Sequence, residues 1–146
     1  MVDRHGPIRT GQFIVEFDGT EVPGWRRVNI PSSSTEELEY QDGDPDGQTT
    51  LITTFQDLQM ERAMGPGDDF ITEWRDDHLS DPLEDVAKDI EITVLDEEHE
   101  ELFSYKFEDA WIKYYNPPSL DVSDAGDISV EEVTLGFDSM EITHEG

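Results

Sequence analysis

The segment that comes closest to a chemical site is Asp42-Gly43-Asp44-Pro45-Asp46-Gly47. Alternating carboxylates followed by a glycine resemble the first half of a calcium-binding loop, in which hard oxygen ligands wrap the cation. The bidentate acid that closes such a loop is missing, because Thr53 stands at the twelfth position. Pro45 lies inside the loop, and the flanking residues have the pattern of strands rather than helices. We therefore interpret the segment as a solvated turn and expect no metal there.

Other reactive side chains do not form a recognisable constellation. No two of the four histidines have the spacing of zinc or iron ligands: His5, His78, His99 and His144. Carboxylate pairs such as Asp76-Asp77 carry little information in a chain this acidic. The sequence has no Gly-x-Ser-x-Gly elbow, phosphate-binding loop or dinucleotide fingerprint. We predict that the protein is not an enzyme and uses no cofactor.

The dominant property of the chain is its negative charge. It carries 37 Asp and Glu residues against 9 Lys and Arg, a formal net charge of −28 over 146 residues. Repulsion among these charges at a mean separation of ~25 Å sums to about 60 kcal/mol in water without salt. Salt at ~0.1 M lowers this to about 5 kcal/mol, comparable with the stability of a whole domain, and molar salt removes it. The composition therefore predicts a halophilic protein.

The same composition excludes several classes of protein. Hydrophobic residues make up 34% of the chain and aromatic residues 10%, which favours one ordered domain, residues 1–146, over an acidic disordered segment. Without a basic patch, binding to nucleic acid or to an anionic membrane surface is not expected. Cysteine is absent, so there is no disulfide or thiolate site. Met1 leads into a polar segment with no apolar signal region or membrane span, so we expect folding in the cytoplasm.

Hydrophobic periodicity predicts a mainly β protein. Alternating apolar residues and turn signals place strands at residues 12–17, 25–30, 36–40, 49–60, 90–94, from 102 onward and 128–137. In the strand from 102, the apolar parity changes near Glu108-Asp109, which predicts a β-bulge. The last strand shows a similar change, from Ile128 and Val130 to Val133 and Leu135.

One helix is expected from Asp68 or Asp69 to about Ser80, where Pro82 follows shortly after. Its apolar residues are typical of a helix that covers the mouth of a sheet. Six or seven antiparallel strands with one flanking helix fit a small β-barrel or sandwich.

The last third of the chain carries a family resemblance. Residues 107–120 read FEDAWIKYYNPPSL, and residues 128–137 read ISVEEVTLGF, ahead of Met140-Glu141-Ile142. Together with 11–19 (GQFIVEFDG) and 37–43 (ELEYQDG), these segments resemble, in order and spacing, the tail tube proteins of contractile phages and phage-like injection systems. Two family features differ: an "L-P-G" is replaced by Thr49-Thr50-Leu51, and an "R-G" before the helix by RAMG at 62–65.

The resemblance implies a structural subunit that forms hexameric rings, which stack into a hollow tube inside a contractile sheath. Its partners would be further copies of itself, the sheath, the baseplate and cap proteins, and the translocated cargo. After cytoplasmic assembly, the protein would belong to a virion tail or an injection particle. The alternative is a free-standing acidic β-sandwich that binds carbohydrate or protein through aromatic residues: Trp25, Trp111, Tyr114 and Tyr115. Such a module would remain monomeric in high salt.

Two sets of residues are expected to act in assembly. The resemblance implies that the loop from Asp42 to Gln48 contacts neighbouring subunits. A lumen in which cargo slides should lack sticky apolar patches and carry one sign of charge. The alternating polar residues beside the loop are therefore predicted to face the lumen: Glu36, Glu37, Glu39, Thr49, Thr53, Gln56 and Asp57.

Overall fold

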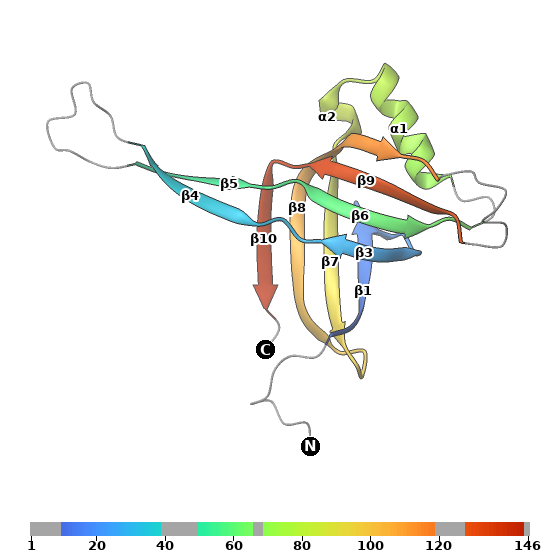
Figure 1. Cartoon of the computed structure of the whole chain (residues 1–146), viewed down its shortest axis with the longest axis horizontal. Coiled ribbons are helices and arrows are strands. Elements are labelled where there is room, and N and C mark those ends of the chain that lie inside the picture. The colour runs from blue at the N-terminus through green and yellow to red at the C-terminus, as the bar shows by residue number, and fades with distance from the viewer. Residues whose placement is uncertain (1–9, 39–49, 66–68, 119–127, 145–146) are drawn as a thin grey trace, which may run out of the picture.

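The computed structural model describes residues 10–38, 50–65, 69–118 and 128–144. These ranges form ten antiparallel strands and two helices (Figure 1), so the predicted mainly β class is confirmed with more strands than expected. The elements are β1 (Thr10–Phe17), β2 (Thr20–Glu21), β3 (Trp25–Asn29), β4 (Ser33–Leu38), β5 (Thr50–Phe55), β6 (Leu58–Ala63), α1 (Phe70–Ser80), α2 (Leu83–Val86), β7 (Lys88–Asp96), β8 (Glu101–Asn116), β9 (Val130–Gly136) and β10 (Ser139–His144).

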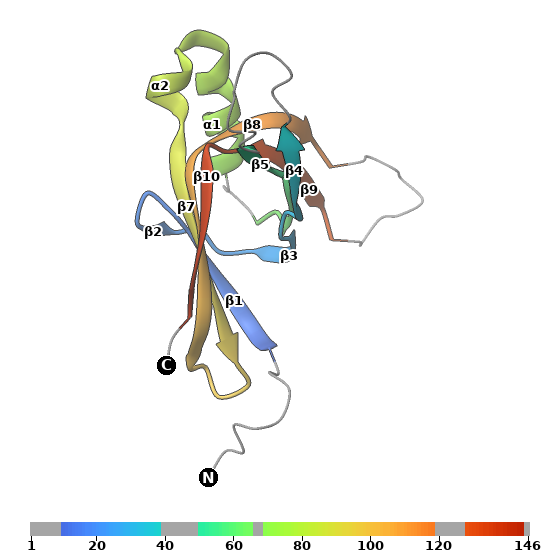
Figure 2. The same cartoon turned by 90° about the vertical axis from the view of Figure 1, so that its left-hand side faces the viewer.

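The long strand β8 joins two sheets that enclose the core. Its first half lies between β7 and β10, and with β1 and β2 these strands form sheet I. Its second half pairs with β9, and the order β8-β9-β6-β3 forms sheet II. Figure 2 shows β8 turning from one sheet into the other. In the part of the chain that the structure describes, β2 and β3 end the strand order, so the sheets do not close into the predicted barrel.

The turn in β8 coincides with the predicted β-bulge. Asp109 adopts a left-handed φ of 53°, and the pairing with β7 jumps from Ile90↔Phe107 to Lys88↔Ala110. The Asp109 N–H donates to Asp89 Oδ1 over 3.1 Å. A bulge bends and twists its strand. It thereby allows Phe107 and Ala110, three residues apart, both to be fully buried.

The core lies between the inner faces of the two sheets and under α1. Sheet I contributes Phe17, Ile90 and Phe107 to the core, and sheet II contributes Leu58 of β6 and Leu135 of β9. Helix α1 adds Ile71 and Trp74, and the Trp74 ring meets Phe17 edge-on at 5.5 Å. Its indole N–H donates to the Val86 carbonyl oxygen over 2.7 Å, which fixes α2 beside α1. The predicted helix is confirmed as α1, which covers one end of the two sheets (Figure 1), and the short α2 is a second helix that the sequence did not predict.

Two side chains of α1 bind one peptide unit of β8. The Ile112 N–H donates to His78 Nε2 over 2.9 Å, and Arg75 Nη1 donates to the Ile112 carbonyl oxygen over 3.4 Å. The other ring nitrogen of His78 lies 2.7 Å from the Trp74 carbonyl oxygen, so the imidazole carries its proton on Nδ1. Since the β8–β9 register shifts directly after Ile112, the helix serves backbone groups at an irregular point of the strand.

The predicted single strand 49–60 is wrong. Residues from this stretch form two strands in different sheets: β5 pairs with β4 alone, whereas β6 belongs to sheet II. Gln56 and Asp57 separate the two strands, and the Gln56 N–H donates to the Ser32 carbonyl oxygen over 2.9 Å. Asp57 Oδ1 forms an ion pair with Lys113 Nζ at 2.9 Å. These contacts come from distant parts of the chain and override the continuous alternation.

The predicted parity change in the last strand is also wrong. β9 pairs with β6 in one unbroken register, and its inward positions are Glu131, Val133 and Leu135. The buried Glu131 is paired with Arg62 of β6, whose Nη1 lies 3.4 Å from Glu131 Oε1. Tyr115 Oη donates to Glu131 Oε2 over 2.7 Å. The buried carboxylate of Glu131 therefore takes the inward position at the start of β9, which the hydrophobic pattern assigned to Val130.

Around this pair, Arg62 Nε donates to the Pro23 carbonyl oxygen over 2.9 Å, and the guanidinium lies 5.7 Å from the centre of the Trp25 ring. Burying two charges is costly unless they are paired and hydrogen-bonded. The Arg62–Glu131 pair meets that condition and ties β6, β8 and β9 to the turn before β3.

We predict that His78→Ala lowers the free energy of unfolding by about 1–3 kcal/mol, because the Ile112 N–H loses its acceptor. His78→Gln keeps an oxygen acceptor at a similar reach and should retain most of the stability. Amide hydrogen exchange at Ile112, read with thermal unfolding in molar salt, measures both effects, and His144→Ala on the exposed β10 is the control. Unchanged exchange at Ile112 in His78→Ala would contradict this role.

We predict that Tyr115 makes stability fall at alkaline pH. Burial raises the pKa of Tyr115 above its ordinary value of 10.0, and the hydrogen bond to Glu131 adds to the rise. The unfolded chain thus releases this proton first, so the free energy of unfolding decreases as the pH rises above about 10. Tyr115→Phe should flatten this decrease in urea titrations, whereas Tyr114→Phe, at a 65% exposed position, should not. An equally steep decrease in Tyr115→Phe would refute the assignment.

Candidate functional site

The loop predicted to contact neighbouring subunits lies outside the described residues. This applies to Asp42, Gly43, Asp44, Pro45, Asp46, Gly47 and Gln48, and also to Glu39 and Thr49. The strands that lead into and out of it are described. β4 and β5 pair with each other over six residues, from Ser33↔Phe55 to Leu38↔Thr50. We call this two-stranded ribbon the arm.

The arm projects from the body of the protein (Figure 1). At its base, the Phe55 ring lies 5.9 Å from Phe137, and Ser32 accepts the hydrogen bond from Gln56. Further out, both faces are open: Leu51 is 64% exposed and Ile52 42%. Each face of the arm therefore exposes one large apolar side chain beyond its base.

The arm separates the predicted lumen residues. Directly opposed residues share a face, so the pairs Glu37↔Leu51 and Thr35↔Thr53 belong to one face of the ribbon. Glu36, opposite Ile52, belongs to the other face. Gln56 and Asp57 lie at the break between β5 and β6. The structure therefore does not bring the described candidates together on one surface.

The outer face of sheet II is a polar wall. Strand pairing aligns Asn29, Gln59, Thr134 and Tyr114 in one row across β3, β6, β9 and β8. The next row aligns Arg27, Glu61, Glu132 and Asn116. Trp111 lies over Gly136 at the end of this face, where an added Cβ would come within 2.5 Å of the indole ring, so only glycine fits. Neither row contains an aliphatic side chain.

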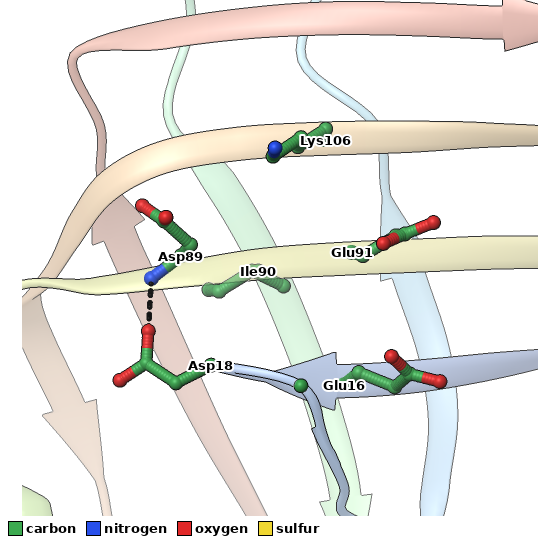
Figure 3. A pocket seen from close by; sticks show the side chains of 7 residues that line it. Glu16, Asp18, Asp89, Ile90, Glu91 and Lys106 are labelled. Carbon is green, nitrogen blue, oxygen red and sulfur yellow. Dashed lines mark hydrogen bonds between the residues drawn. The ribbon is translucent and has the colours of Figure 1, made fainter.

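The outer face of sheet I carries an acidic row. The registers align five charged residues across the sheet: Glu21, Glu16, Glu91, Lys106 and Glu141. Figure 3 shows part of this face, where a shallow pocket of about 370 Å³ is lined by Glu16, Asp18, Asp89, Glu91 and Lys106 among others. Asp18 Oδ1 accepts the Asp89 N–H over 2.8 Å. Like charges directly opposite one another on neighbouring strands destabilise a sheet. This face therefore carries a local share of the repulsion of the whole chain.

A second acidic group forms the turn between β7 and β8. Carboxylate oxygens of Asp96, Glu98 and Glu100 lie within 4.8 Å of one another. Asp96 Oδ1 accepts the N–H groups of Glu98 and Glu100 over 2.8 and 2.9 Å, so this carboxylate organises the turn. His99 sits in the same turn with a φ of 67°.

The aromatic residues proposed for a binding module do not form one groove. Trp25 stacks on Phe17 at 5.9 Å, Trp111 covers Gly136, and Tyr115 binds Glu131. Tyr114 alone of the four is mostly exposed, on the outer face of sheet II. In the described part of the chain, no helix is long and apolar enough to cross a bilayer.

Sequence reasoning missed the surfaces that pairing creates. The acidic row and the polar wall each combine strands from opposite ends of the chain, so no local residue spacing predicts them. The one signal in the sequence was the excess of charge itself.

We predict that Glu16→Gln stabilises the fold by about 0.2–1 kcal/mol at low salt, because Glu16 faces Glu21 and Glu91. The gain should disappear in molar salt, where the repulsion is screened. Urea unfolding across a salt series measures it, with Glu84→Gln on α2 as a control outside the row. A gain that is independent of salt would disprove the electrostatic explanation.

Comparisons with known proteins agree with this architecture. The family model described as T4-like virus tail tube protein gp19 matches residues 9–141. A search of curated proteins gives no match.

Among solved structures, the chain is similar to the anti-feeding prophage cap (AFP tube terminating cap), with 25% identity and a TM-score of 0.76, covering 99% of this chain and 96% of that chain. It is also similar to a chain of the PVC sheath-tube complex of an extracellular contractile injection system in the extended state, with 26% identity and a TM-score of 0.72, covering 95% and 93%. Hcp1 from Flavobacterium johnsoniae shares the fold at 13% identity, with a TM-score of 0.55 and coverage of 91% and 95%.

The family match spans nearly the whole described fold, including both sheets, the arm strands and α1. The chain therefore belongs to the T4-like virus tail tube protein gp19 family, and it is a tube-like structural subunit of the contractile tail and injection machine type.

Proposed function

We propose that this protein forms hexameric rings that stack into the hollow inner tube of a contractile tail or injection machine. The observation that carries the proposal is the family match over residues 9–141. The arm supports it, since its exposed Leu51 and Ile52 are apolar side chains that a neighbouring copy can cover. Open strand edges at β2, β3 and β10 are further groups that neighbouring copies can cover.

The proposed partners follow from the same comparison. The similar chains come from structures described as a sheath-tube complex, a sheath/tube terminator, a tube terminating cap and a baseplate. We infer that this subunit contacts copies of itself, a contractile sheath, a baseplate and a cap, and that cargo passes through its lumen. Assembly takes place in the cytoplasm, and the completed tube belongs to a virion tail or an injection particle.

We propose that the lumen wall is the polar outer face of sheet II, continued by Gln56 and Asp57 at the base of the arm. The two rows of this face that contain Gln59 and Glu61 have the required lack of aliphatic side chains. Of the arm residues predicted from the sequence, Glu36 remains a lumen candidate. Glu37 and Thr53 lie on the opposite face of the ribbon, which we assign to contacts between copies.

We predict that assembly depends on salt. A hexamer would carry −168 formal charges, six times the −28 of one chain. In molar salt the Debye length is about 3 Å, so burial of apolar surface dominates, whereas at ~0.1 M salt rings should dissociate. Sedimentation velocity across a salt series measures the transition. A monomer at all salt concentrations would indicate the binding module instead, and rings that persist unchanged at low salt would refute the electrostatic control.

We predict that the loop from Asp42 to Gln48 acts in assembly and not in metal binding. Replacing Asp42, Asp44 and Asp46 together by Asn should shift the salt concentration at which rings form, because the substitutions remove three like charges from a contact between subunits. Thermal stability of the parent protein should be unchanged by a calcium chelator. A large drop in melting temperature on chelation would overturn this assignment.

A further inference from the structure

The inner face of sheet I extends beyond the part that sheet II covers. Its successive rows across β1, β7, β8 and β10 are aligned by strand pairing, and the row Phe17–Ile90–Phe107–Met140 packs in the core. The last row, Phe13–Val94–Phe103–His144, is only half-buried at its apolar residues. In both views this end of sheet I continues past β3 (Figures 1 and 2).

An open groove of about 530 Å³ lies at this uncovered end, between sheet I and β3. Trp25 and Val28 of β3 form one wall, and Phe13, Val94 and Tyr105 belong to the other. Its complete lining is Gly11, Gln12, Phe13, Trp25, Val28, Ile30, Ile92, Val94 and Tyr105.

None of these nine residues is charged, although 32% of the chain is Asp, Glu, Lys or Arg. The outer face of sheet I, by contrast, carries four glutamates in one row. Two copies of a protein with a charge of −28 repel each other most where carboxylates meet. The groove is a place where a second copy can bury apolar surface without bringing carboxylates into contact.

One face of the arm, like the groove, carries almost no charge. Leu51, Thr53 and Phe55 share one face of the ribbon with Ser33 and Thr35, and Glu37 is the one charged residue on the described part of that face. Leu51, at 64% exposure, lies furthest from the base of the arm. The base of the arm is fixed to the body where Phe55 packs against Phe137, and Leu51, further out on the same face, is exposed.

We propose that the arm of one copy docks in this groove of a second copy, with the Leu51 face of the arm against Trp25, Val28 and Tyr105. Arm and groove are different surfaces of the same chain, so the contact is heterologous and each copy uses both. Such contacts continue from copy to copy, around a closed ring or from ring to ring. The proposal rests on the proposed function and names the surfaces through which neighbouring copies hold one another.

Disulfide trapping tests the contact directly, because the natural chain contains no cysteine. One protein carries Leu51→Cys in the arm, and another carries Val28→Cys, a change of similar volume, in the groove. Mixed in molar salt and oxidised, they should give a covalent dimer on non-reducing denaturing gels. Neither protein alone should give it. Leu79→Cys, at a 78% exposed position on α1, replaces the arm variant as the control and should give at least ~10-fold less dimer.

A second variant keeps the test independent of cysteine chemistry. Leu51→Asp should raise the protein concentration needed for half-maximal assembly by at least ~10-fold and leave the melting temperature unchanged, because Leu51 is exposed in the single chain. Leu79→Asp adds the same charge at another exposed leucine and should leave assembly unchanged.

The outcomes separate the two proposals. If the parent protein assembles in molar salt but the Leu51–Val28 dimer does not form, or Leu51→Asp assembles normally, the docking contact is wrong while the tube function stands. If the parent protein does not assemble at all, both the tube function and the docking contact are overturned.

Discussion

Repulsion among carboxylates is the constraint that the rest of this structure obeys. With 37 acidic residues against 9 basic ones, any surface that brings carboxylates together adds to this repulsion. The fold directs these charges outward, as in the row of Glu21, Glu16 and Glu91 on sheet I. The described core contains one buried ion pair, Arg62–Glu131, in which the carboxylate is matched by a guanidinium and a tyrosine hydroxyl. The groove beside β3 carries no charge at all. Position, more than composition, decides which surfaces can meet another molecule.

Strand β8 arranges these surfaces relative to one another. The left-handed Asp109 turns it from sheet I into sheet II, so one strand contributes Phe107 to one layer and Ile112 to the other. Where its ladder becomes irregular, His78 and Arg75 of α1 bind the Ile112 peptide. The acidic face, the polar face and the groove are consequently held by one continuous strand and the helix that braces it. In the tube subunit that we propose, these two sheets would form the wall of the lumen, and the arm would contact a neighbouring copy.

Much of this fold could be predicted from the sequence, and the failures have clear physical causes. Alternating apolar residues and the proline after α1 located most strands and the helix, because these signals are local. The parity change at Glu108-Asp109 correctly indicated a bulge. The same reasoning failed at Glu131, where an inward carboxylate is stabilised by Arg62, which lies far away in the sequence on the paired strand β6. It failed again at Gln56 and Asp57, because contacts with Ser32 and Lys113 end a strand whose alternation continues. The arm and the groove depend on which strands lie side by side, so neither could be located from local pattern.

The central claim is that this acidic subunit builds a hollow ring whose wall is the polar face of sheet II. Electron cryomicroscopy of the protein assembled in molar salt tests it most directly, since a ring and its lining are read from the same map. We predict a six-fold ring with an open lumen lined by Asn29, Gln59 and Thr134, and with the acidic row of sheet I turned away from it. Assemblies without a ring, or a lumen lined by the apolar groove or by sheet I, would contradict the claim.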